Sequence, residues 1–201
     1  MAKLLDIILV IDLEATCWEG KTPEGQRQEI IEIGLCPLDL ATGERLERRS
    51  ILVLPELSEV SPFCEELTTI TQDMLNRDGV PLREAFRILK KEYMSQRRVW
   101  ASWGDFDRRL IERECEARHM GYPMGPTHLN AKTLFSLLHG MTREHGMARA
   151  MELLGLPLEG THHRGHDDAW NIAAALSTLI GPKSAGFFNQ MLAIQDEDDE
   201  G

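Results

Sequence analysis

The first apolar stretch of the chain predicts a buried strand. Residues 7–13 read Ile-Ile-Leu-Val-Ile-Asp-Leu, and such runs are typical of central strands that are covered on both faces. Residues 28–38 and 45–54 are also strand-like, and the turn-rich segment 39–44 between them is short enough for an antiparallel hairpin. A fourth, shorter strand is predicted at 99–103.

Helical spacing dominates most of the remaining chain. After Pro81, which is tolerated in a first helical turn, apolar side chains recur at helical intervals from Leu82 to Tyr93. A second helical series runs from Leu110 to Arg118. Further helices are predicted at 131–139, 146–154, 166–180 and 184–194. This order of elements suits one α/β domain in which helices flank a mixed sheet.

Length and composition limit the class of protein. A chain of 201 residues with 42% hydrophobic composition has room for one core. The four cysteines form no C-x-x-C pair, which favours free thiols in a reducing compartment, so we expect a cytoplasmic protein. Asp6 and Asp12 interrupt the apolar run Leu4–Leu13, which is far shorter than the ~20 residues of a membrane-spanning helix. We therefore expect no membrane contact and no signal peptide.

The formal net charge of −11 limits the kind of polyanion that the chain binds. Five of the acids lie in the run Asp196–Glu200, and residues 196–201 are predicted to form a disordered acidic tail. The acidity argues against a long footprint on a duplex more than against binding of a short strand end. Small basic clusters are interpreted as ordinary exposed charge; they comprise Arg45, Arg48 and Arg49, Arg97 and Arg98, and Arg108 and Arg109.

Two acids close the first predicted strand. Asp12 and Glu14 are two residues apart, so on a strand they project from the same face with Cα atoms roughly 6.6 Å apart. The C-terminal edge of a sheet is where α/β proteins place their ligand crevices. We interpret the pair as ligands of one cation, and the alternative is the solvated end of a strand.

A third acid is predicted where the 99–103 strand gives way to a helix. In this segment Asp105 is interpreted as the helix N-cap. Asp107 instead shares the core-facing side of Leu110 and Ile111. A buried carboxylate requires a cation or another partner, although a second capping group is the alternative.

The segment 162–168 combines three histidines and two acids at the start of a predicted helix. Asp168 lies at the head of the apolar stripe of this helix, and Asp167 is the expected cap. A zinc site is the less favoured interpretation, because no H-E-x-x-H motif or cysteine pair accompanies the histidines. A histidine just ahead of Asp168 is suited to accept a proton at neutral pH.

Four inward acids and one histidine are the side chains that metal-dependent phosphodiester hydrolysis requires. Hard oxygen ligands hold two Mg²⁺ or Mn²⁺ ions about 3.5 to 4 Å apart. Such ions lower the pKa of the attacking water, steady the leaving 3′ oxygen and neutralise charge on the phosphoryl oxygens. The residues therefore favour a two-metal hydrolase.

Three motifs of this chain resemble those of the DEDDh exonucleases. They are I-D-L-E-A-T-C at 11–17, F-D at 106–107, and H-x-x-x-x-D at 163–168. Trp18 and the stretches 29–32 and 61–72 further resemble the branch that trims histone mRNA and small RNAs.

The resemblance implies a ribonuclease H-like α/β fold with a mixed five-stranded sheet. The resemblance covers roughly residues 5–182, and we expect an exonuclease domain over residues 1–182. A C-terminal helix at 183–195 is expected to pack on it. The expected activity is 3′-to-5′ removal of nucleoside 5′-monophosphates from single-stranded nucleic acid, with RNA favoured over DNA.

Individual roles follow from the same resemblance. Asp12 would bridge both metals, and Glu14 and Asp168 would complete the nucleophile-side site. Asp107 would hold the second ion largely through water. His163 would be the general base.

The resemblance also implies contacts with the substrate. Thr16, Phe63, Leu67 and Phe106 would contact the terminal nucleotide, although the three apolar side chains are equally compatible with the core. His166 stands where the family usually has an apolar residue, so it is an alternative base. The five-residue spacing to Asp168 favours His163.

Two rival functions are weighed against the exonuclease. Haloacid-dehalogenase-type phosphatases have a nucleophilic aspartate at the end of a first strand. Their pattern also requires a second aspartate, where this chain has Glu14, and a catalytic lysine, for which only Lys132 is available. A non-catalytic RNA-binding relative is the other alternative. The presence of all five catalytic positions argues against loss of activity.

Overall fold

The computed structural model describes residues 3–182, so the predicted C-terminal helix and acidic tail lie outside the described residues. Within this range no helix combines the length and apolarity needed to cross a bilayer. The strands are β1 (Leu4–Ala15), β2 (Ile30–Asp39), β3 (Arg49–Leu52), β4 (Arg98–Ser102) and β5 (His128–Asn130). The helices are α1 (Pro62–Thr68), α2 (Gln72–Asp78), α3 (Leu82–Glu92), a 3₁₀ turn η1 (Ser95–Arg97), α4 (Phe106–Ala117), α5 (Ala131–Leu138), α6 (Met147–Leu153) and α7 (Gly165–Ile180).

The five strands form one mixed sheet in the order β3-β2-β1-β4-β5. β1 pairs with β2 and β2 with β3 in antiparallel fashion, whereas β4 runs parallel to both β1 and β5. The predicted α/β fold with a mixed five-stranded sheet is thereby confirmed. Sequence patterns did not locate β5, because it has only three residues.

The second strand of the hairpin is shorter than its prediction. Residues 45–54 were expected to be one strand, but β3 covers only Arg49–Leu52. Arg45 makes an isolated bridge with Leu38 instead. The side chains of Arg45 and Arg48 both bind Glu159, in the loop before α7. Residues 45–48 make these contacts where regular pairing with β2 has ended.

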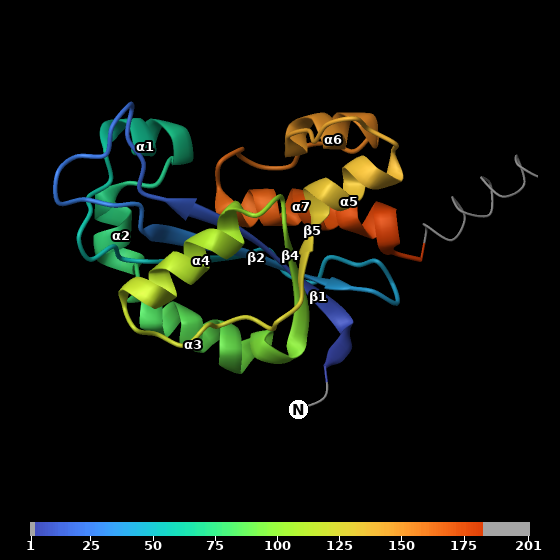
Figure 1. Ribbon diagram of the computed structural model, residues 1–201, viewed down its shortest axis with the longest axis horizontal. Helices are drawn as coiled ribbons and strands as arrows, with labels where there is room; N and C mark the ends of the chain where they lie inside the picture. Colours follow the sequence, from blue (N-terminus) through green and yellow to red (C-terminus); the bar gives the residue numbers. More distant parts are fainter. Residues whose placement is uncertain (1–2, 183–201) are drawn as a thin grey trace, which may run out of the picture.

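Helices cover both faces of the sheet (Figure 1). On one face, Leu9, Ile11 and Leu13 of β1 share a buried cluster with residues of α3 and α4. On the other, Ile8 and Val10 pack with α7. Because side chains alternate along a strand, Asp12 and Glu14 continue the α7-facing row.

A pair of glycines lets α7 begin directly against the sheet. A Cβ atom built on Gly34 of β2 would lie 1.8 Å from the carbonyl carbon of Gly165, the first residue of α7. A Cβ on Gly165 would in turn lie 2.9 Å from the carbonyl oxygen of Asp12. Only glycine allows backbones to approach this closely. The first turn of α7 is therefore held beside the end of β1.

Candidate active site

Acids that are far apart in the sequence meet at the end of β1. Asp12 and Glu14 come from β1, and Asp168 comes from the first turn of α7. Each of these three residues has a ligand oxygen within 4.8 Å of those of the other two. Glu14 and Asp168 are buried and Asp12 is partly buried. The sequence-predicted ligands Asp12, Glu14 and Asp168 are therefore brought together.

The fourth predicted acid reaches the same place from the opposite layer. Asp107 lies in the first turn of α4, is buried, and accepts a hydrogen bond from the backbone N–H of Leu13 at 2.9 Å. Asp105 occupies the N-cap position, but its side chain does not cap the helix. It is 3.4 Å from Arg108 instead, so the prediction of a capping role for the Asp105 side chain is wrong.

These acids destabilise one another's charged forms. Burial raises the pKa of Glu14 to about 9, and the carboxylates of Asp168, Glu32 and Asp107 add to this. Burial and the neighbouring carboxylates, Asp107 foremost, likewise raise the pKa of Asp12 well above its ordinary value. Clustered acids with raised pKa values are relieved when cations bind between them. The donors are all hard oxygens, which fit a divalent metal.

A second buried acid, Glu32, lies on the adjacent strand and is surrounded by hydrogen-bond donors. The Glu32 carboxylate accepts hydrogen bonds from the Ser50 hydroxyl at 2.5 Å and from the Gly165 N–H at 2.9 Å. Burial alone would raise its pKa, but hydrogen bonds from His166, Ser50 and Arg164 hold the pKa at about 2. Glu32 is therefore a charged, fully paired anchor that ties the start of α7 to β2.

The two candidate bases have different surroundings. His166 has Nδ1 2.8 Å from Glu32 and Nε2 3.0 Å from Asp167, so both of its ring nitrogens are engaged within the protein. His163 is half-buried, and its backbone N–H donates to Asp168 at 3.0 Å. Its φ of 63° places it in the left-handed region, which is uncommon for residues other than glycine and is concentrated at functional sites.

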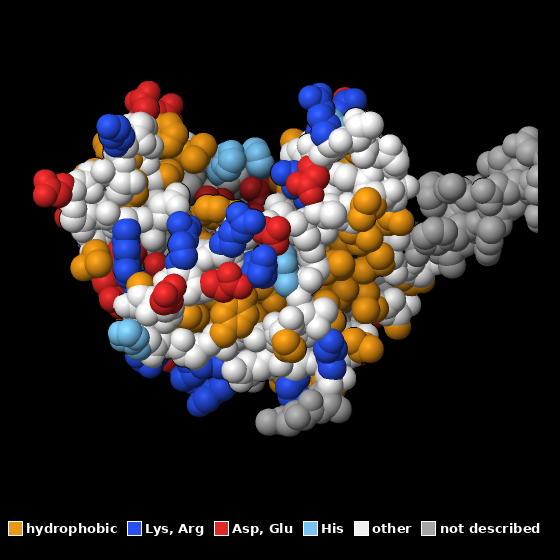
Figure 2. Space-filling model, viewed as in Figure 1, with side chains coloured by type: hydrophobic (Ala, Val, Ile, Leu, Met, Phe, Trp, Pro, Cys, Tyr) orange, Lys and Arg blue, Asp and Glu red, His pale blue; other side chains and the backbone are white. Residues whose placement is uncertain are grey.

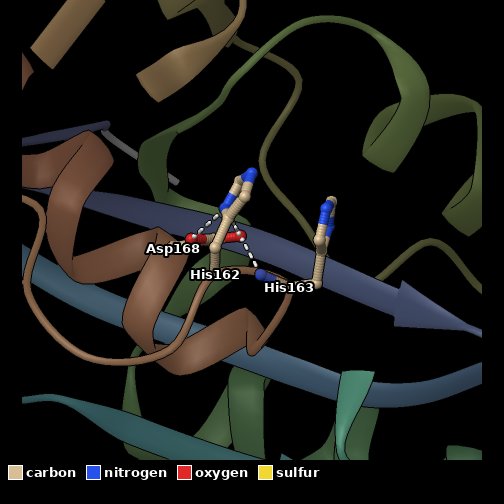
Figure 3. A group of neighbouring side chains, drawn as sticks. All are labelled: His162, His163 and Asp168. Atoms are coloured by element: carbon tan, nitrogen blue, oxygen red, sulfur yellow. Dashed lines mark hydrogen bonds and ion pairs between the residues drawn. The ribbon is translucent and has the colours of Figure 1, made fainter. Parts of the chain in front are cut away.

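Sequence reasoning did not single out His162, which contacts Asp168 directly. Its Nδ1 lies 3.1 Å from both carboxylate oxygens of Asp168. Its ring stacks on that of His163 with the centroids 4.0 Å apart, and both rings rise from the same loop beside the carboxylate (Figure 3). Burial and the adjacent His162 lower the pKa of His163 below its ordinary value. The only sequence signal for His162 was that it precedes His163.

The predicted cap of α7 has another role. Asp167 accepts a hydrogen bond from the N–H of Thr161 at 2.6 Å and forms an ion pair with Arg48. Arg164 holds the N-cap position, without a side-chain cap. The prediction that Asp167 caps the helix is therefore wrong, because its side chain turns back to the loop and to the segment before β3.

The predicted substrate contacts divide into exposed and buried residues. Phe63 and Leu67 on α1 and Phe106 at the start of α4 are 39%, 36% and 47% exposed. Figure 2 shows a hollow between α1 and the α5–α6 region, with acidic and histidine side chains at its floor and apolar side chains at its edge. Thr16 is fully buried, and its hydroxyl donates to Arg27 and accepts from Glu29, each at 3.0 Å. This favours a structural role for Thr16 over the predicted contact with substrate.

Comparison with known proteins decides the family. A sequence profile of the exonuclease family matches residues 9–176, which is most of the described chain and includes the four acids and His163. The chain belongs to the exonuclease family. The predicted resemblance is thereby confirmed.

The exonuclease domain has relatives with defined names. Human 3′-5′ exoribonuclease 1 is 31% identical over 182 residues, which cover 84% of this chain and 50% of the human protein. The 3′-5′ exonuclease Snipper of Drosophila melanogaster is 26% identical over 195 residues, which cover 86% of this chain and 69% of Snipper. The chain thus spans half to about two thirds of the length of these relatives.

A solved structure shares the fold closely. The nuclease domain of 3′hExo, described as a DEDDh family member bound to rAMP, matches with a TM-score of 0.79 at 27% identity, over 89% of this chain and 94% of that domain. The ribonuclease H-like fold is therefore confirmed. The DEDDh exonuclease fold implies a divalent metal, in agreement with the oxygen donors described above. The phosphatase alternative finds no support.

Proposed function

We propose that this exonuclease domain removes nucleoside 5′-monophosphates from the 3′ end of single-stranded RNA, using two Mg²⁺ or Mn²⁺ ions. The observation that carries the proposal is the cluster of Asp12, Glu14 and Asp168 oxygens within 4.8 Å of one another, with Asp107 alongside. The raised pKa values of Asp12 and Glu14 support it, because such acids are paired poorly by the protein alone.

The acids have distinct positions around the proposed ions. Asp12 lies between the α7 side and the α4 side, since it is close to Asp168 and since the Asp107 charge raises its pKa. Asp12 would therefore hold both ions, Glu14 and Asp168 one of them, and Asp107 the other. When bound, the ions supply charge neutralisation and a water of lowered pKa.

His163 is the proposed general base. Its pKa lies below the ordinary value, so the imidazole is neutral at pH 7 and is ready to accept a proton from water. Its backbone link to Asp168 keeps the ring beside the acids. His166 is not proposed as the base, because Glu32 and Asp167 engage both of its ring nitrogens.

The preference for RNA is inferred from the relatives. Human 3′-5′ exoribonuclease 1 is an RNA-degrading enzyme by name, and the 3′hExo domain was solved with rAMP. The exposed side chains of Phe63, Leu67 and Phe106 offer apolar surfaces against which the terminal nucleotide can stack. We retain the cytoplasm as the proposed location, which the four free cysteines support.

One assay tests activity, polarity and sugar preference together. A 5′-labelled single-stranded RNA and its matched DNA are incubated with the chain and Mg²⁺ or Mn²⁺. We expect a ladder that shortens from the 3′ end, release of nucleoside 5′-monophosphates, and faster decay of the RNA. Hydrolysis of p-nitrophenyl phosphate without a ladder would overturn the proposal. Asp12→Asn is the matched inactive control.

A further inference from the structure

A groove lies along the exposed face of α4, the helix whose first turn carries Asp107. Phe106, Arg109 and Arg113 are spaced three and four residues apart, so they share one exposed face of this helix. All three line a hollow of about 560 Å³, together with Gln28 and Lys132. Phe106, the first of the three residues, directly precedes the proposed metal ligand Asp107 in the sequence.

The groove continues beyond α4. A second hollow of about 570 Å³ shares Gln28 and Arg113 with the first and extends to Gln26 and Arg27. The Arg113 guanidinium lies 3.4 Å from the Gln28 side-chain oxygen at the junction. The two hollows therefore form one path from Phe106, at the start of α4, to the 22–28 loop.

In the described part of the chain, Arg109 and Arg113 are not neutralised by acids, whereas Lys132 and Arg27 on the same path pair with Glu144 and Glu29. Among residues 3–182, the Arg109 side chain makes no hydrogen bond or ion pair, and Arg113 contacts only the neutral Gln28. The adjacent Arg108 differs, because it pairs with Asp105 and Glu112. In a chain with a net charge of −11, unpaired arginines beside an acidic site attract an anion strongly.

The surface view agrees with this arrangement. Figure 2 shows a row of Lys and Arg side chains over α4, directly below the hollow that contains the acids. Arg109 and Arg113 are separated by about 6 Å along the helix axis, since each residue advances 1.5 Å. Two guanidinium groups in series suit a ligand that carries repeated negative charges.

We infer that Arg109 and Arg113 bind the phosphates of the nucleotides that precede the terminal one, so that the single strand leaves the acids along α4. The inference rests on the proposed function and adds the path of the strand. Cations are needed there because the acids repel every phosphate that lies outside the metal site. Phe106 lines the same hollow as Arg109 and offers its exposed ring to a base. The inference assigns Arg109 a binding role, whereas the sequence alone favoured ordinary exposed charge.

Substrate length tests this path. We compare kcat/KM for a dinucleotide, which ends before the groove, with that for a decanucleotide, which fills it. The wild-type chain is expected to prefer the decanucleotide, and Arg109→Ala/Arg113→Ala is expected to lose about tenfold of that preference, mainly through KM. The control Arg83→Ala/Arg87→Ala removes two arginines with the same spacing from α3 and is expected to retain the preference.

Salt dependence gives a second readout that misfolding does not mimic. Each lost phosphate contact lowers the slope of log(kcat/KM) against log[salt] by about 0.7 for a single strand, so the double variant is expected to lose about 1.4. Arg109→Lys/Arg113→Lys keeps both charges and is expected to keep the slope. Thermal melting verifies that each variant is folded.

The outcomes separate the two proposals. If the wild-type chain releases mononucleotides and the double alanine variant keeps both the length preference and the salt slope, the α4 path is wrong while the exonuclease proposal stands. If the wild-type chain releases no mononucleotide from either RNA, the exonuclease proposal itself is wrong.

Discussion

Glu14 and Glu32 face each other across the β1–β2 pair, yet their environments are opposite. Both are buried acids. Glu14 lies among other carboxylates, which together with burial raise its pKa to about 9. Glu32 receives hydrogen bonds from His166, Ser50 and Arg164, which hold its pKa at about 2 against burial. Burial alone therefore does not define a metal ligand; the number of donors that the protein supplies does.

Glu32 belongs to a group of residues that stabilise the fold, whereas Glu14 belongs to a group that is suited to bind cations. The Glu32 cluster is internally satisfied, and it fixes α7 against the sheet. The Glu14 cluster is internally repulsive, and it depends on cations from solution. We expect variants of the first cluster to lose stability and variants of the second to lose activity.

The largest effect is expected for Asp12→Asn. This change removes the acid assigned to both ions, so kcat is expected to fall by about a thousandfold or more. The melting temperature of the metal-free protein is expected to hold or rise, because asparagine is neutral without having to retain a proton at a site where burial and neighbouring carboxylates oppose ionisation. Single-turnover cleavage and thermal melting in EDTA measure the two effects. A large loss of stability in Asp12→Asn would instead indicate that Asp12 stabilises the fold, as Glu32 does.

The two histidines extend the same contrast. His163→Ala is expected to lower kcat by about a hundredfold or more while metal binding survives, because it removes the proposed base. His166→Ala is expected to lower the melting temperature instead, since the partners Glu32 and Asp167 lose their imidazole. Turnover rates and melting temperatures of both variants show which histidine is the base. Near-normal turnover in His163→Ala with an inactive, well-folded His166→Ala would reverse the assignment.

Glu32→Ala tests the structural cluster alone. It leaves Ser50, Gly165 and His166 without a buried acceptor, and the free energy of unfolding is expected to fall by about 3 kcal/mol. Glu14→Gln is the matched control on the facing strand and is expected to cause no such loss in EDTA. Urea denaturation of both variants provides the measurement. Equal losses would remove the distinction between the clusters.

The last expected effect is on the pH dependence of stability. The pKa of Glu14 rises from an ordinary 4.5 to about 9 on folding, so the metal-free fold retains a proton that the unfolded chain releases. The free energy of unfolding therefore falls as the pH rises from about 4.5 to about 9. Glu32 acts in the opposite direction, with stability gained as the pH rises from about 2 to 4.5.

Thermal melting between pH 5 and pH 9 in EDTA measures this trend. Glu14→Gln is expected to weaken the decline, and saturating Mg²⁺ or Mn²⁺ is expected to offset it. A flat profile for the metal-free wild-type protein would contradict the assigned environment of Glu14.

Sequence patterns predicted the parts of this molecule that local spacing determines. The β1 run, the helical stripe of α7 and the inward direction of Asp107 all follow from which face of an element a residue occupies. β5 escaped prediction because three residues carry no usable periodicity. Local spacing was therefore sufficient to assign the predicted metal ligands to the correct strand and helices.

Tertiary partners were not predictable in the same way. The side chains of Asp105 and Asp167 turn to arginines instead of capping their helices, and a choice between such partners is made only in the folded chain. The close approach of Gly34 to Gly165 likewise joins residues that are distant in sequence. Sequence spacing reveals faces of elements, whereas contacts between elements require coordinates.

Metal binding tests the central claim most directly. Mn²⁺ binding is measured by electron paramagnetic resonance on the wild-type chain, on Asp12→Asn and on Glu32→Gln. The account predicts that the wild-type chain binds Mn²⁺ in the absence of nucleic acid, that Asp12→Asn loses this binding, and that folded Glu32→Gln retains it. Equal Mn²⁺ binding by the wild-type chain and Asp12→Asn would contradict the account.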